Sequence, residues 1–130
     1  MIIDTSALIA IILNEPEARA IVRAIKLAPV RLICSVTLFE VYTVILSRSK
    51  EPGVAFLERL IAELKIETEN FTEKTRIEAQ RGFYFYGKGR HEAKLNFGDC
   101  MVYALAKELD EPLLCKGDDF TKTDITLVSY

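Results

Sequence analysis

The stretch MIIDTSALIA, residues 1–10, places a carboxylate between a short apolar run and the start of an apolar helix. Residues 1–3 are apolar and partly β-branched, and helix-like spacing begins only after Thr5 or Ser6, either of which can cap a helix with its hydroxyl. The stretch therefore predicts a strand, a turn at Asp4 and a helix. Asp4 then either marks only this boundary or forms half of a metal site.

The rest of the chain repeats this alternation of strand and helix. Further strands are predicted at residues 30–34, 65–69, 112–115 and, at an edge, 125–128. Helices are predicted from Pro16 to about 27, from 36 to the break at Pro52 and Gly53, over 54–64, from 72 towards 86, and up to about 109. Strands separated by such helices need crossovers, which produce a mostly parallel sheet with helices on both faces. The predicted fold class is α/β with three layers.

Length and composition predict one domain over residues 1–130, because half of the side chains are apolar and can fill a single core. The three cysteines are an odd number within apolar segments, which favours a reducing, cytoplasmic setting over a disulfide framework. No apolar stretch approaches the roughly 20 residues that span a bilayer, so we expect no membrane segment. The formal charge of −2 does not attract nucleic acid over the whole surface. Polyanion binding must therefore be local or helped by cations.

Four acidic residues occupy comparable places in these predicted elements. Asp4 follows the first strand, Glu40 and Asp99 lie in the first turns of two helices, and Asp118 follows the strand that ends at Cys115. Ligands of parallel sheets bind beyond the carboxyl ends of the strands, so all four would meet at one edge.

Each acid also has a purely structural explanation. Thr37 with Glu40 and Asn96 with Asp99 both have capping-box spacing, and an acid in a first helical turn is favoured by the macrodipole. Asp118 beside Gly117 fits an ordinary turn. Helix ends alone would barely offset the mutual repulsion, which is about 4 kcal/mol for two carboxylates ~4 Å apart at an effective dielectric of 20.

A divalent cation removes this conflict. Carboxylate ligands select Mg²⁺ or Mn²⁺ over Zn²⁺, and the single histidine and the unpaired cysteine spacings offer no zinc site. Such ions suit phosphoryl chemistry, so the predicted reaction is phosphodiester hydrolysis.

The motifs MIIDTSAL, SVTLFEV, NFGDCMVYALA and LLCKGDDFTKTDI, in this order along the whole chain, resemble those of PIN-domain ribonucleases, specifically the VapC toxins of toxin–antitoxin pairs. The resemblance implies a Rossmann-like PIN domain that cleaves RNA as an endonuclease with Mg²⁺ or Mn²⁺. It also implies a homodimer and inhibition by a VapB-type antitoxin.

Site residues carry over from the motifs one by one. The three acids that match the family are Asp4, Glu40 and Asp99. Asp118 matches a fourth, more variable acid, and Asp119 competes for that place at lower rank. Lys116 stands two positions before Asp118, where the family often has Thr or Ser. Ser6 resembles the family's small hydroxyl residue after the first acid, and it is predicted either to orient the metal ligands or to bind a water. Thr5 is a lower-ranked candidate for the same role.

Two surfaces are predicted from charge and apolar pattern. Lys88, Arg90 and Lys94 lie in a glycine-containing basic loop just before the helix of Asp99, where they bind RNA phosphates or form an ordinary solvated loop. The aromatic run 83–86 fits core or dimer packing, and Phe56 and Leu60 lie off the main apolar stripe of their helix. We read that surplus as a dimer or antitoxin surface.

Three functional classes remain open. The leading hypothesis is the metal-dependent endoribonuclease. A phosphotransferase that works through an aspartyl phosphate usually needs a second acid two residues after the first, where this chain has Ser6. A catalytically silent RNA- or protein-binding module would not require the full set of acids.

Overall fold

A four-stranded parallel sheet forms the centre of the computed structural model, which describes residues 1–130. The strands are β1 (Ile2–Ile3), β2 (Leu32–Cys34), β3 (Glu67–Glu69) and β4 (Leu113–Leu114). Their order across the sheet is β3-β2-β1-β4, and Ile2 pairs with both Leu32 and Leu113. The strands predicted in these four places are confirmed, although each is shorter than the predicted segment. The segment predicted as an edge strand at 125–128 does lie beside β4, but it pairs there only through a parallel bridge between Leu113 and Leu127 and forms no extended strand.

Five helices connect and follow these strands. They are α1 (Thr5–Ile12), α2 (Ala18–Leu27), α3 (Ser35–Leu64), α4 (Glu73–Tyr86) and α5 (Phe97–Leu109). The break predicted at Pro52 and Gly53 between two helices lies at Lys50, whose φ of 54° makes a kink between the two helical halves of α3. Thr72 caps α4 through a capping box with Thr75. No helix has the length and apolar character that a membrane crossing demands.

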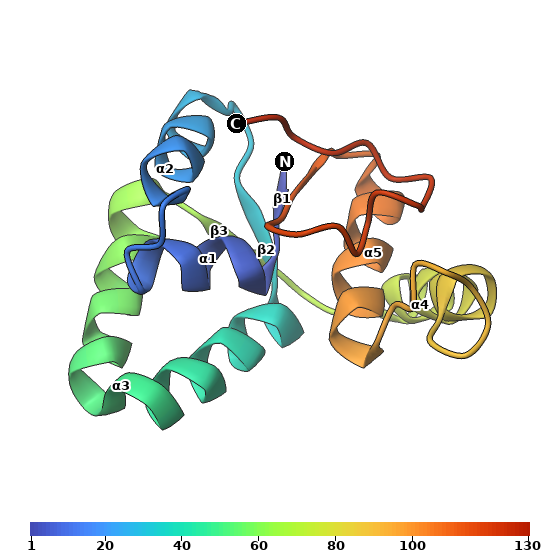
Figure 1. Ribbon diagram of the computed structural model, residues 1–130, viewed down its shortest axis with the longest axis horizontal. Helices are drawn as coiled ribbons and strands as arrows, with labels where there is room; N and C mark the ends of the chain where they lie inside the picture. The colour runs from blue at the N-terminus through green and yellow to red at the C-terminus, as the bar shows by residue number, and fades with distance from the viewer.

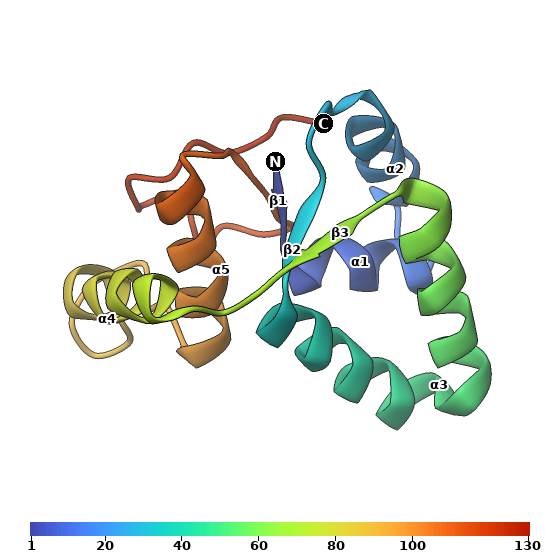
Figure 2. The ribbon, with the colours of Figure 1, turned by 180° about the vertical axis from the view of Figure 1, so that it is seen from behind.

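The helices cover both faces of the sheet, as Figures 1 and 2 show from opposite sides. Helices α1, α2 and α3 lie on one face, and α4 and α5 lie on the other. Successive strand residues point to opposite faces, so they divide between two buried clusters. Ile3, Ile33 and Leu114 belong to the cluster under α1 to α3. Ile2, Leu32 and Leu113 belong to the cluster under α5. The predicted three-layer α/β fold is confirmed.

The order of the strands reverses at β1. From β1 the chain moves to β2 and β3 on one side and then returns to place β4 on the other side of β1. Parallel sheets bind ligands beyond the carboxyl ends of strands at such a switch point. Asp4 follows β1 at this position, and its backbone N–H donates to the Leu114 carbonyl at 3.0 Å.

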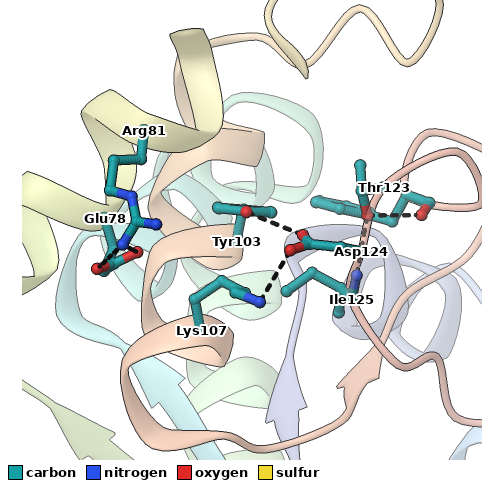
Figure 3. A network of polar contacts seen from close by, with 8 residues as sticks. Glu78, Arg81, Tyr103, Lys107, Thr123, Asp124 and Ile125 are labelled. Atoms are coloured by element: carbon teal, nitrogen blue, oxygen red, sulfur yellow. Dashed lines mark hydrogen bonds and ion pairs between the residues drawn. The ribbon is translucent and has the colours of Figure 1, made fainter. Parts of the chain in front are cut away.

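The segment after β4 is fixed to α5 by the polar network of Figure 3. The Tyr103 hydroxyl donates to Asp124 Oδ1 at 2.9 Å, and Lys107 Nζ donates to Asp124 Oδ2 at 2.9 Å. The Thr123 hydroxyl donates to the Phe120 carbonyl at 2.8 Å and accepts from the Ile125 N–H. These bonds hold the C-terminal segment against the helix that carries Asp99.

Candidate active site

Asp4 is buried at the boundary between β1 and α1. It is 8% exposed, and it is itself the N-cap of α1, with Oδ2 accepting from the Ser6 N–H at 2.9 Å and from the Ser6 hydroxyl at 2.5 Å. The prediction that Thr5 or Ser6 caps this helix is therefore wrong, because the carboxylate at the strand end already satisfies the free N–H. Burial is the largest influence on the pKa of Asp4 and raises it, the Ser6 bonds oppose this rise, and the charge of Glu40 adds to it.

Ser6 links this carboxylate to the chain beyond β4. Its hydroxyl oxygen accepts from the Lys116 N–H at 2.8 Å while the hydroxyl donates to Asp4. The Lys116 ammonium does not turn to the same carboxylate, since it pairs with Glu15 at 2.5 Å and with Glu17 at 3.0 Å. The backbone N–H of Lys116, the residue that departs from the family pattern, thus supports the site through Ser6. Its side-chain charge is neutralised by Glu15 and Glu17.

Glu40 projects from α3 towards α1. The Thr5 hydroxyl donates to Glu40 Oε2 at 2.6 Å, so Thr5 contacts an acid of the site, as does Ser6. The capping box predicted for Thr37 and Glu40 is wrong, because α3 already begins at Ser35, and Thr37 lies inside it with its hydroxyl unbonded. A Cβ at Gly98 would lie 2.7 Å from Glu40 Oε1. The glycine of the NFGDC motif therefore leaves room for the Glu40 carboxylate where it lies, a role that the spacing alone did not reveal.

Asp99 lies in the first turn of α5 and forms the predicted capping box. Its Oδ2 accepts from the Asn96 N–H at 2.7 Å, and Asn96 Oδ1 accepts from the Asp99 N–H at 3.0 Å. Burial raises the pKa of Asp99 to about 6, the Asn96 bond opposes this, and the charges of Asp4, Asp119 and Glu40 add to it. Asp99 is therefore close enough to three other carboxylates to sense their charge.

Asp119 is the third carboxylate whose charge raises the pKa of Asp99. Burial raises the pKa of the Cys115 thiol to about 12, and the charges that add to this rise are Asp4, Asp119 and Asp99. Asp118 is not among the charges that raise either Asp99 or Cys115. The Asp118 carbonyl accepts from the N–H and the hydroxyl of Thr121, at 3.0 and 2.7 Å, in a turn. The charge of Asp119 thus reaches Asp99 and Cys115, although the sequence ranked Asp118 first, and the choice of the fourth acid stays a prediction.

The four carboxylates, which we call the acid cluster, are Asp4, Glu40, Asp99 and Asp119. None of the influences on the pKa of Asp4 or Asp99 comes from a basic side chain. No three of the acids lie close enough together in this structure to coordinate one metal ion. Glu40 and Asp99 instead have oxygens bonded to Thr5 and Asn96. A group of uncompensated carboxylates with no nitrogen or sulfur donor still has the chemistry that Mg²⁺ or Mn²⁺ prefers.

The predicted basic loop is exposed at all three of its candidate residues. Arg90 is fixed, since its Nε donates to the Tyr84 carbonyl at 2.9 Å and its guanidinium lies 4.8 Å from the centre of the Tyr84 ring. Lys94 adopts φ 55° in the turn that precedes α5. A role for Lys88, Arg90 and Lys94 in RNA binding stays a prediction.

The raised pKa of Asp99 predicts how stability depends on pH without metal. In the folded protein the carboxyl of Asp99 has a pKa of about 6, whereas an ordinary aspartate has a pKa of 3.8. This carboxyl therefore favours the folded state most at pH values below 3.8. That advantage is lost as the pH rises through about 6. Urea unfolding in EDTA at pH 5 and pH 7 should therefore show Asp99→Asn gaining more stability relative to wild type at pH 7. An equal difference at the two pH values would contradict the shift.

The chain was compared with known proteins. Residues 1–125 match a family model described as PIN domain. A ribonuclease VapC from Mycolicibacterium smegmatis is 41% identical over 128 residues, which cover 98% of this chain and 99% of that protein. The crystal structure of VapC20 from Mycobacterium tuberculosis, a Sarcin-Ricin loop cleaving toxin, has a TM-score of 0.78 at 16% identity and covers 98% of this chain and 97% of that one. The crystal structure of VapBC2 from Rickettsia felis, bound to a DNA fragment from their promoter, has a TM-score of 0.77 at 17% identity. It covers 98% of this chain and 96% of that one. These two structures have the same fold as this chain.

Proposed function

The chain belongs to the PIN domain family and, within it, to the VapC ribonucleases, and from this premise we propose that it is the toxin of a toxin–antitoxin pair. It acts as an endoribonuclease that hydrolyses RNA phosphodiester bonds with Mg²⁺ or Mn²⁺. The observation that carries this proposal is the acid cluster at the switch point of the sheet, where Asp99 has a pKa of about 6 beside three other carboxylates.

Each residue of the cluster has a role in the proposal. Asp4, Glu40, Asp99 and Asp119 would hold the ions, and Asp118 remains the alternative fourth acid from the sequence motif. A bound divalent ion supplies a Lewis acid for the phosphate and lowers the pKa of water. Ser6 orients the carboxylate of Asp4, and Thr5 orients that of Glu40. These hydroxyls are positioning groups, because each contacts an acid and leaves other oxygens of the cluster free.

The relatives do not favour the two other classes considered from sequence. A phosphotransferase would need Asp4 as an exposed nucleophile, whereas Asp4 is 8% exposed and one of its oxygens accepts two hydrogen bonds. A silent binding module would have no need for a buried carboxylate among like charges.

The proposed protein partner is a VapB-type antitoxin. The solved Klebsiella pneumoniae and Rickettsia felis neighbours are toxin–antitoxin complexes. A homodimer is part of the same proposal, and apolar rings available for such contacts include Phe83, Tyr84 and Phe85, which are 45 to 63% exposed.

Removal of metal tests the proposed reaction directly. The purified protein should cleave single-stranded or structured RNA with Mg²⁺ or Mn²⁺, and EDTA should reduce this cleavage to background because uncompensated carboxylates repel the phosphate. Gel analysis of labelled RNA gives the measurement, and added Mn²⁺ after EDTA should restore the activity. Equal cleavage in EDTA would contradict the proposed metal-dependent reaction.

A further inference from the structure

A hollow of about 230 Å³ lies beside the acid cluster, between the first turns of α3 and α5. We call it the aromatic slot and define it by Thr37, Phe39, Glu40, Phe97, Gly98 and Met101, which line it. The slot shares Glu40 with the acid cluster, and Gly98 directly precedes Asp99. A strand of RNA with a phosphate at the cluster therefore has a neighbouring nucleotide beside the slot.

Two phenylalanine rings at the slot are exposed to a degree that packing does not explain. Phe97 is 74% exposed and Phe39 is 65% exposed, although both are large apolar side chains. Phe39 is held by Tyr42, whose ring is stacked with it at a centroid distance of 6.5 Å and an interplanar angle of 13°. The slot thus presents two exposed aromatic rings, one of which is stacked with a neighbouring tyrosine.

The other lining residues indicate which group fits between these rings. No basic side chain lines the slot, and the carboxylate of Glu40 does, so the slot repels a phosphate. An uncharged planar group suits the apolar walls. Thr37 also lines the slot, is 1% exposed, and has a hydroxyl without a hydrogen-bond partner. A nucleobase supplies both the flat face for the rings and polar edge groups that can satisfy such a hydroxyl.

We propose that the aromatic slot binds one nucleobase of the RNA, next to the phosphate that is cleaved, with the base stacked on Phe97. This inference rests on the proposed ribonuclease function. Stacking on an aromatic ring tolerates any base, so the slot holds the strand in register without selecting a sequence by itself.

Fluorescence tests the contact without cleavage. The chain contains no tryptophan, so Phe97→Trp creates a single indole reporter at the slot. In the Asp99→Asn background with Mg²⁺, where cleavage is slow, a single-stranded oligoribonucleotide should quench this indole, whereas an abasic ribose–phosphate chain of the same length should not. Phe56→Trp is the matched control, since Phe56 is also exposed but lies beyond the kink of α3. Equal quenching by both chains, or no quenching while the RNA binds, would overturn the proposal. A change of emission with protein concentration alone would assign the ring to contact between two copies, and would overturn it too.

Kinetics separate this proposal from the proposed function. Phe97→Ala should raise KM roughly tenfold with kcat nearly unchanged, because one stacked base is lost, and Phe97→Tyr should restore the wild-type KM. If wild-type protein cleaves RNA with metal but KM is the same in Phe97→Ala, the slot proposal fails and the ribonuclease stands. If wild-type protein cleaves no RNA in any metal, the proposed function itself fails.

Discussion

Asp99→Asn is expected to reduce metal-dependent RNA cleavage by about 100-fold or more, because a lost ligand should cost more than the 10- to 100-fold typical of groups behind the ligands. The amide keeps an oxygen that can accept from the Asn96 N–H, so the capping box and the start of α5 are preserved. The loss should therefore appear in kcat with a folded protein, as circular dichroism and labelled-RNA assays would show.

The same variant should be more stable than wild type in EDTA. Removal of a partly buried charge from three like charges should raise Tm by about 3–5 °C after the lost helix-dipole interaction is subtracted. Addition of Mg²⁺ should raise the Tm of wild type more than that of the variant. Asp110→Asn is the matched control, because Asp110 lies at the other end of α5 in the left-handed conformation, which Asn accepts. Full activity in Asp99→Asn would refute the proposed centre.

Asp119→Asn is expected to lower RNA cleavage by about 10- to 100-fold, and Asp118→Asn by no more than about threefold. The two residues are adjacent, both are exposed, and the substitutions remove the same charge. Of these two residues, Asp119 alone is among the charges that raise the pKa of Asp99. Asp118 stabilises its turn through its backbone carbonyl, which accepts hydrogen bonds from Thr121. The substitution leaves this carbonyl in place.

Parallel assays of the two variants at several Mg²⁺ concentrations give the measurement. A higher Mg²⁺ requirement in Asp119→Asn alone would identify it as the fourth acid. The opposite pattern would return that role to Asp118 and show that the turn rearranges when metal binds.

Sequence patterns predicted the layers of this fold because apolar runs and helical spacing record which faces are buried. They also placed Asp4, Glu40 and Asp99 at one edge, since a parallel sheet brings the carboxyl ends of its strands together. The capping box of Asn96 and Asp99 was predictable from four residues of local sequence. These features depend on periodicity or on short-range hydrogen bonds.

Other features of the site depend on tertiary contacts that no local pattern records. Gly117 adopts φ 102°, and the turn that follows decides whether Asp118 or Asp119 faces the cluster. The helix start at Ser35, two residues before the predicted cap, left the hydroxyl of Thr37 without its expected partner. The hydrogen bond from Thr5 to Glu40 joins residues 35 positions apart, which spacing could not reveal.

The bond between Ser6 and the Lys116 N–H has a consequence for synthesis of the protein on the ribosome. A growing chain that has emerged only through α4 lacks β4, so β1 has one open edge and Asp4 lacks the support that reaches it through Ser6. Asp99 and Asp119 are also made late in the chain. An unfinished copy therefore cannot assemble the centre, and a ribonuclease built in this order remains harmless to the RNA of its own ribosome until nearly all of it has been translated.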